Sequence, residues 1–269
     1  MKNLIAGLFL ASAMAVGVNA ADNVVIPKGY TKLVFQDEFN KAGMPDTTKW
    51  VYEKGYIRNG EMQYYTARRR ENCYTADGLL HIVALNDSAR IDGEIRPVTS
   101  ASIQTRGKHF WKYCYVEVRA KLPKCLGSWP AIWMMPEKSV YGSWPRSGEI
   151  DIMEHVGYDP DKVHFSVHSL KYNHMINTQF TSHTVMPGTD KEFHVYGLEW
   201  KEDSITWFID GKPYYTVTNE KTGWEAWPFD QDFYLKLNQA FGGGWGGSQG
   251  VNLKELPQDY QIDYVRIYQ

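Results

Sequence analysis

The chain has 269 residues, of which 43% are hydrophobic and 22% charged, so it can bury a sizeable core and is not a disordered protein. Its 29 Lys and Arg residues are balanced by 31 Asp and Glu residues, for a net charge of −2 at pH 7. This balance offers no basic surface for nucleic acid or an anionic membrane, so neither is an expected partner.

Residues 1–20 have the pattern of a secretory signal peptide. Lys2 precedes an apolar stretch over residues 4–16, and small residues stand at the cleavage positions that end at Ala20. The apolar stretch is too short to span a bilayer, and no cysteine at its end would carry a lipid anchor. We therefore predict that the mature protein, residues 21–269, is secreted or periplasmic and has no membrane span.

The mature chain contains three cysteines, Cys73, Cys114 and Cys125, so at most one disulfide can form. A bridge between Cys114 and Cys125 is one alternative. The other is that Cys114, which stands in a segment of alternating polarity, is a small core residue. No base stands beside any of the three in the sequence, so we expect no catalytic thiol.

Alternation of apolar and polar residues, typical of strands with one buried face, recurs along the mature chain. In residues 114–122 every even position is apolar. Residues 204–217 are divided by Asp210 and Gly211, a pair that accepts the positive φ angles of a tight turn, so they predict a hairpin. Residues 260–268 form a further predicted strand.

Residues 21–269 show no helical pattern of three or more turns, no repeat and no linker, so they predict one domain. About 250 residues of short antiparallel strands need two stacked sheets to bury their apolar faces. We expect an all-β fold, a two-sheet antiparallel β-sandwich of the jelly-roll, concanavalin-like kind. Its concave face would be a cleft that presents side chains to a long ligand.

Three carboxylates gather in one predicted strand. Glu149 and Asp151 are two residues apart, so they share a face and leave Ile150 for the core. Glu154 has the opposite parity and joins this face only if a β-bulge near Ile152 and Met153, two successive apolar residues, takes up one residue. The Cα atoms of Glu149 and Glu154 are then about 13 Å apart. Side chains leaning inward from a curved sheet can close this to the about 5–5.5 Å between the carboxyls of a retaining glycosidase.

Three carboxylates on one face cannot all ionise freely. At least one pKa should rise, and a raised pKa keeps an acid protonated near neutral pH. The alternative is a solvated acidic strand whose carboxylates pair with Lys or Arg. The apolar Ile150, Ile152 and Met153 argue against it because they indicate a buried strand, but from these residues alone both interpretations stay open.

The segment Glu149-Ile-Asp-Ile-Met-Glu154 resembles the active-site signature Glu-x-Asp-x-x-Glu of family-16 glycoside hydrolases, in the laminarinase-like branch with a bulged strand. The lichenase branch, with Glu-x-Asp-x-Glu, fits less well. The resemblance extends over nearly the whole mature chain. Its further motifs, in the family's order, are residues 35–40, 59–65, 127–136, 242–247 and 263–268.

This resemblance implies a jelly roll that hydrolyses glycosidic bonds by double displacement with retention of configuration. Glu149 would be the nucleophile that forms a glycosyl-enzyme, and Glu154 the acid that later acts as base. Asp151 would hydrogen-bond the nucleophile. The chemistry requires no cofactor, and the expected partner is a polysaccharide or oligosaccharide, bound by a monomer.

Aromatic residues make up 14% of the chain, and flat rings suit the apolar faces of sugars. Trp129, Trp133 and Trp144 are candidate substrate-binding residues around the acidic strand, and the family pattern favours a cleft position for them. Trp245, in a glycine-rich segment, is a further candidate. For any one of these tryptophans, a position in the core is at least as compatible with the residues alone.

Two more substrate-binding residues follow from the resemblance. His168 would project from the neighbouring strand toward Glu154, and Asn59 would hydrogen-bond a sugar on the glycone side. His164 and His168 do not predict a metal site, because residues four apart on a strand lie about 13 Å from each other.

Many relatives in this family carry a structural Ca²⁺ on the convex face, away from the chemistry. Glu38, Gly78 and Asp263 match positions that supply oxygen ligands, backbone carbonyls included. The resemblance thus implies a modest calcium site with two carboxylates.

Several functions stay open. The leading hypothesis is a secreted endo-acting β-glycosidase that cuts β-1,3-glucan or mixed-linkage β-1,3/1,4-glucan. The same mechanism would serve β-galactosides, as in mucin-type O-glycans, keratan or algal galactans, because glucose and galactose differ only at C4. A non-catalytic lectin needs neither Glu149 nor Glu154, so the presence of both favours an enzyme. The sequence does not separate hydrolysis from transglycosylation.

Overall fold

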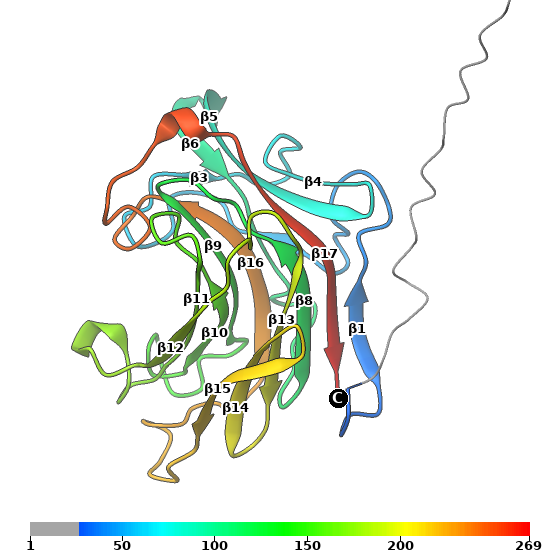
Figure 1. Cartoon of the computed structure of the whole chain (residues 1–269), viewed down its shortest axis with the longest axis vertical. Coiled ribbons are helices and arrows are strands. Elements are labelled where there is room, and N and C mark those ends of the chain that lie inside the picture. The colour runs from blue at the N-terminus through cyan, green and yellow to red at the C-terminus, as the bar shows by residue number, and fades with distance from the viewer. Residues whose placement is uncertain (1–26) are drawn as a thin grey trace, which may run out of the picture.

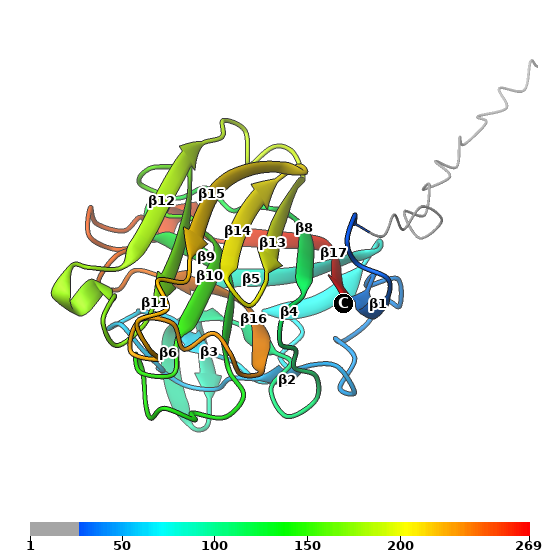
Figure 2. The same ribbon diagram turned by 90° about the horizontal axis from the view of Figure 1, so that it is seen from below.

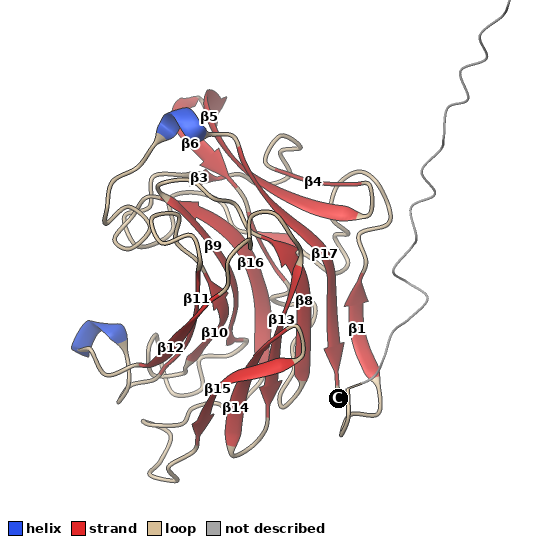
Figure 3. Cartoon of the chain, in the orientation of Figure 1, coloured by secondary structure: helices blue, strands red, loops and turns tan. Residues whose placement is uncertain are grey.

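The computed structural model describes residues 27–269, so the predicted signal peptide lies outside the described residues. Within this range the chain folds into 17 strands and two short 3₁₀ helices, η2 (His174–Ile176) and η3 (Leu253–Glu255), and contains no α-helix (Figure 3). None of the described helices is long and apolar enough to cross a membrane.

The larger of the two sheets has ten strands. They are β1 (Leu33–Asp37), β3 (Tyr64–Tyr65), β4 (Cys73–Ala76), β5 (Leu79–Ile91), β6 (Glu94–Ser100), β8 (Tyr115–Lys121), β13 (His194–Trp200), β14 (Ser204–Ile209), β15 (Lys212–Thr218) and β17 (Gln258–Tyr268). Their order is β15-β14-β13-β8-β17-β5-β6-β3, with β1 paired to β17 and β4 to β5. All these pairs are antiparallel except β3 with β6.

The smaller sheet has seven strands, all paired antiparallel. They are β2 (Val51–Tyr52), β7 (Ser102–Gln104), β9 (Ser128–Pro136), β10 (Glu149–Glu154), β11 (Lys162–His168), β12 (Phe180–Val185) and β16 (Phe233–Phe241). Their order is β12-β11-β10-β9-β16-β7-β2. The two sheets stack face to face and are strongly curved (Figures 1 and 2). The predicted two-sheet sandwich is confirmed.

The core fills the space between the sheets. The even positions of β8, Val116, Val118 and Ala120, are fully buried there and join one hydrophobic cluster with Ile150 of β10 and Phe165 of β11. Each such valine contributes about 1.5–3 kcal/mol through burial. The odd positions of β8 are more exposed, except Tyr115, as the sequence alternation predicts.

Two local predictions are also resolved. β14 and β15 form the predicted hairpin, and the turn has φ of 50° at Asp210 and 75° at Gly211. Cys73, Cys114 and Cys125 are all buried free thiols, so the Cys114–Cys125 bridge is not formed. Cys114 is the small core residue of the other interpretation.

Candidate active site

A β-bulge in β10 brings the three carboxylates to one wall. Asp151 is opposite Ser166 of β11, and Glu154 is opposite His164, so three residue steps on β10 span two on β11. The predicted bulge is confirmed. Glu149, Asp151 and Glu154 consequently line one cleft of about 800 Å³ on the outer face of the smaller sheet.

The bulge is anchored from the core. The two consecutive side chains that break the alternation, Ile152 and Met153, are both buried in the hydrophobic cluster. The backbone carbonyl of Asp151 accepts a hydrogen bond of 2.8 Å from Nε1 of Trp207, which is fully buried on β14 of the opposite sheet. Leaving such a buried carbonyl unpaired costs about 1–3 kcal/mol, so Trp207 stabilises the irregular backbone on which the site depends.

Two tryptophans hold the outer carboxylates. Nε1 of Trp144, in the loop before β10, donates to Oε2 of Glu149 at 2.6 Å. Nε1 of Trp129, near the start of β9, donates to Oε1 of Glu154 at 3.0 Å. Both rings are partly exposed in the cleft, so these tryptophans combine an indole donor for a carboxylate with an apolar surface for a ligand.

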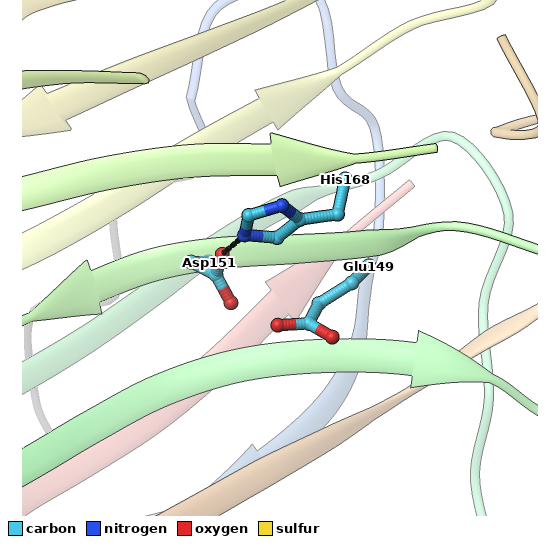
Figure 4. Close-up of side chains that lie close together, drawn as sticks. All are labelled: Glu149, Asp151 and His168. Atoms are coloured by element: carbon cyan, nitrogen blue, oxygen red, sulfur yellow. Dashed lines mark ion pairs between the residues drawn. The ribbon is translucent and has the colours of Figure 1, made fainter. Parts of the chain in front are cut away.

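Asp151 lies between the two glutamates and is buried. Figure 4 shows Asp151 and Glu149 on the same strand, with His168 reaching over from β11. Nε2 of His168 is 3.3 Å from Oδ2 of Asp151, an ion-pair distance without hydrogen-bond geometry, since that oxygen has no hydrogen-bond partner among the described residues. His168 therefore contacts Asp151, whereas the family resemblance implies only that it projects toward Glu154. Its charge would still act on Glu154 at a longer range.

Burial and mutual repulsion set the protonation of this group. Burial, and then the charge of Glu149, raise the pKa of Asp151 well above its usual range, and a hydrogen bond with Glu149 acts in the same direction. Burial, followed by the charges of Asp151 and Glu149, likewise raises the pKa of Glu154, while the Trp129 hydrogen bond and His168 oppose the rise. The raised pKa values favour the protonated forms of Asp151 and Glu154, and a protonated Glu154 is what its predicted role as the acid requires.

Some side chains of this group are close enough together to be considered as a metal site. The ligating atoms of Glu149, Asp151 and His168 lie within 4.8 Å of one another, close enough to share a cation. A proton shared between the two carboxylates satisfies this geometry equally well, so we assign no metal to it. His164 is outside this set.

The remaining predicted sugar-binding residues also line the cleft. Trp245 stands edge-on to Trp129, with ring centroids 5.5 Å apart. Nδ2 of exposed Asn59 donates to Oε1 of Glu61 at 3.2 Å. Trp133 differs from the other tryptophans because only 8% of its surface is exposed, so it belongs to the floor of the cleft.

Several cleft residues are not among those predicted. They are Arg58, Glu61, Ala131, Met135, His164, Ser166, His174, Met175, Gln179, Thr181, Asn238, Ala240 and Gly244. A signal exists for Asn238, because Lys236 and Asn238 alternate with Leu235 and Leu237 in β16 and so mark a polar face. Nε1 of Trp133 donates to Oδ1 of Asn238 at 2.6 Å.

Two of these unpredicted residues are histidines on the β11–β12 side. The His164 ring packs edge-on against Trp245 at 4.9 Å, and burial, then neighbouring His183, lowers the pKa of His164 to about 4. His174 of η2 lies 5.0 Å from the ring of Trp144. Burial, then His168, lowers the pKa of His174. Because its pKa is about 4, His164 remains neutral at pH 7 and can donate or accept a hydrogen bond in the cleft.

The three residues of the implied calcium site do not line the cleft. Nε and Nη2 of Arg266 bind both carboxylate oxygens of Glu38, at 2.8 and 2.9 Å. Asp263 stands at a bulge of β17, and its Oδ2 pairs with Arg119. Gly78 follows β4. The Glu38 carboxylate is thus engaged, and the oxygens that remain for a cation are Oδ1 of Asp263 and backbone carbonyls.

The fold is a curved β-sandwich, and its cleft holds two glutamates in different surroundings beside indole rings. This is the architecture of a glycoside hydrolase. The family model of Glycosyl hydrolases family 16 matches residues 51–266, and the chain belongs to this family. The chain is 46% identical over 246 residues to a β-glucanase of Rhodothermus marinus, across 88% of this chain and 85% of the relative.

A solved structure and a more distant relative show how far the similarity extends. The X-ray structure of the laminarinase from Rhodothermus marinus matches with a TM-score of 0.85 at 46% identity, covering 88% of this chain and 97% of that one. A keratan-sulfate endo-1,4-β-galactosidase of Sphingobacterium multivorum is 34% identical over 239 residues, across 88% of this chain and 55% of that protein. The predicted membership of family 16 is confirmed, and the protein is a glycoside hydrolase.

Proposed function

We propose that the protein is an endo-acting β-glucanase that hydrolyses internal linkages of β-1,3-glucan or mixed-linkage β-1,3/1,4-glucan. The bulge of β10 carries this proposal, because it brings Glu149 and Glu154 to one cleft with different surroundings. The named β-glucanase and laminarinase relatives support glucan as the substrate.

The proposed reaction has two steps. In the first, a carboxylate oxygen of Glu149 attacks the anomeric carbon, the glycosidic bond breaks, and Glu154 gives its proton to the leaving oxygen. In the second, Glu154 takes a proton from a water molecule, whose oxygen attacks the same carbon and displaces Glu149. Protonated Asp151 hydrogen-bonds Glu149 and limits the negative charge of the cluster.

The extent of the cleft supports cleavage within a chain. Its lining runs from Thr181 on β12 to Asn238 on β16, across five adjacent strands. At about 4.8 Å per strand this is about 19 Å, with the catalytic strand in the middle. Sugars can therefore occupy both sides of the cleaved bond. We assign Asn59 and Trp133 to the glycone side, and Trp129, Trp144, Trp245 and His168 to the sugars around the carboxylates.

A substrate panel tests this proposal. We expect early products from laminarin and barley β-glucan to be oligosaccharides of mixed length, with the β-anomer formed first in NMR spectra of the reaction. Release of single glucose units only, or of the α-anomer first, would contradict endo action or retention. If neither glucan is cleaved, the proposed substrate is wrong.

A second candidate substrate is a β-galactoside, favoured by the 34% identity to the keratan-sulfate endo-1,4-β-galactosidase. The same panel should therefore include porphyran, keratan sulfate and mucin O-glycans. Faster cleavage of any of these than of laminarin would select this candidate and show that the contacts at C4 favour the axial hydroxyl.

We also propose that the protein is exported, cleaved after Ala20 and active as a monomer. A structural calcium ion would take Oδ1 of Asp263 and backbone carbonyls of Glu38 and Gly78, and would tie the start of the chain to β17 without entering the chemistry. We expect calcium to raise the melting temperature relative to the protein in EDTA, by a few degrees, through preferential binding to the folded state. Asp263→Asn should lose this shift but keep its activity. Equal melting temperatures with and without calcium would exclude the site.

A further inference from the structure

A buried cation lies beside the cleft, where the proposed reaction does not use it. Lys236 is 3% exposed and stands on β16 directly opposite Trp133 of β9. Its Nζ is 4.1 Å from the centroid of the Trp133 ring and 2.9 Å from Oε1 of Glu53. Lysine is almost never buried without a charged partner, so this position depends on Glu53.

Glu53 joins Lys236 to a second cation. Its Oε2 pairs with Arg58 and accepts a hydrogen bond of 2.7 Å from Ser102. The guanidinium of Arg58 lies 5.1 Å from the Trp133 ring. Burial opposes ionisation of Glu53, but Lys236 and Arg58 together lower its pKa to about 2. The carboxylate is therefore charged at any working pH and holds two cations against one ring.

The Trp133 ring is held at its edge by a hydrogen bond and on its π face by a cation. Asn238 accepts the indole N–H of Trp133, and Nδ2 of the same amide donates to the hydroxyl of Tyr65 at 3.0 Å. The cation of Lys236 contacts the π system. A tryptophan without this contact could tilt about its hydrogen bond, and a cleft floor that tilts binds a rigid sugar less tightly.

We propose that Lys236 is a positioning residue of the glycan cleft: its ammonium group, held by Glu53, fixes the Trp133 ring against which a sugar on the glycone side binds. This inference rests on the proposed function. Lys236 acts through Trp133 and takes no part in bond cleavage, so its loss should weaken glycan binding much more than it slows the chemical step.

Because Lys236 is buried, its effect on glycan binding should depend on pH. Burial, followed by the charge of Arg58, lowers the pKa of Lys236 to about 8, although Glu53 and Glu149 oppose the change. Gln104, opposite Lys236 on β7, is neutral. Lys236 therefore loses its proton as pH rises through about 8, while Arg58 and Glu53 keep their charges. The contact with Trp133 weakens over the same range.

The test measures glycan affinity without turnover. A Glu154→Gln background is preferred over Glu149→Gln, because the charge of Glu149 contributes to the pKa of Lys236. In this background, the Kd for a β-1,3-gluco-oligosaccharide is measured by calorimetry from pH 6.5 to 9.5. We expect Kd to rise about fivefold over this range, less than the full strength of one desolvated cation–π contact, because Lys236 acts on the sugar only through Trp133.

Two substitutions separate charge from shape. Lys236→Met, of similar length without charge, should raise Kd about fivefold at pH 7 and remove the pH dependence. Lys236→Arg, permanently charged, should stay within about twofold of the parent at pH 7 and remain flat to pH 9.5. In the otherwise unaltered enzyme, Lys236→Met should raise KM and change kcat by less than about twofold.

Lys49→Met is the matched control. Lys49 also lies over an aromatic ring, 5.8 Å from that of Phe35, and pairs with a carboxylate, that of Asp37 at 3.3 Å, but outside the cleft. It should leave Kd and its pH dependence unchanged.

The outcomes are separable. Wild-type affinity in Lys236→Met at pH 7, or an unchanged alkaline rise of Kd in Lys236→Arg, would overturn the role of Lys236. If Lys236→Met does not fold, Lys236→Arg and the pH series still decide the question. Failure of the Glu154→Gln protein itself to bind the glucan at pH 7 would instead overturn the proposed substrate, and the role of Lys236 with it.

Discussion

Glu149→Gln is expected to lower kcat on β-glucan by at least about 1,000-fold, because an amide oxygen is too weak a nucleophile to displace a sugar leaving group. The substitution is otherwise conservative. The Gln carbonyl can still accept the indole hydrogen bond that Trp144 gives to Oε2 of Glu149 at 2.6 Å. Rates on laminarin, followed by reducing-end assay, measure the loss.

Glu149→Gln should not lower the stability of the folded state. Glu149 raises the pKa of both Asp151 and Glu154 through repulsion, so removing its charge relieves strain within a buried acidic cluster. We expect the melting temperature to be unchanged or slightly higher. Glu117→Gln, a partly buried carboxylate on β8, is the control and should keep full activity. A Glu149→Gln protein with more than a tenth of wild-type activity would exclude Glu149 as the nucleophile.

The arrangement of the carboxylates could be predicted from the sequence because it depends on short-range geometry. Strand parity places Glu149 and Asp151 on one face, and two successive apolar residues before Glu154 indicate where the alternation must break. The same local rule predicts the buried face of β8 and the turn at Asp210. Parity alone left catalysis and a solvated acidic strand equally open, and the family motifs were needed to choose.

The groups that support the site from behind could not be predicted, because they come from segments that only tertiary packing brings together. Trp207 supports the bulge from 56 residues away and from the other sheet. Lys236 reaches Glu53 across 183 residues. Composition predicts tryptophans near a sugar, but it does not distinguish Trp129, partly exposed beside Glu154, from Trp133, buried over a cation.

Glu154→Ala should lose activity on polysaccharide by at least about 1,000-fold, because an unactivated leaving oxygen then departs without a proton. Burial, followed by the charges of Asp151 and Glu149, raises the pKa of Glu154 and so favours the acid form in the wild type. The protonated form exists below that pKa, so wild-type kcat/KM should fall as pH rises through it. The residual kcat of Glu154→Gln, measured at saturating substrate so that the effect of Lys236 on binding does not contribute, should show no alkaline fall.

Azide should restore turnover in Glu154→Ala on an aryl β-glucoside whose leaving group needs no proton. In this variant Glu149 can still form the glycosyl-enzyme, and azide, which needs no base, enters the space vacated beside Trp129. Attack by Glu149 and then by azide each invert the anomeric carbon, so the product is a β-glycosyl azide. In Glu149→Ala, azide would replace the nucleophile itself, and one inversion gives the α-glycosyl azide. NMR of the two products therefore assigns both glutamates independently. The same anomer from both variants, or no rescue of either, would contradict the roles proposed for this pair.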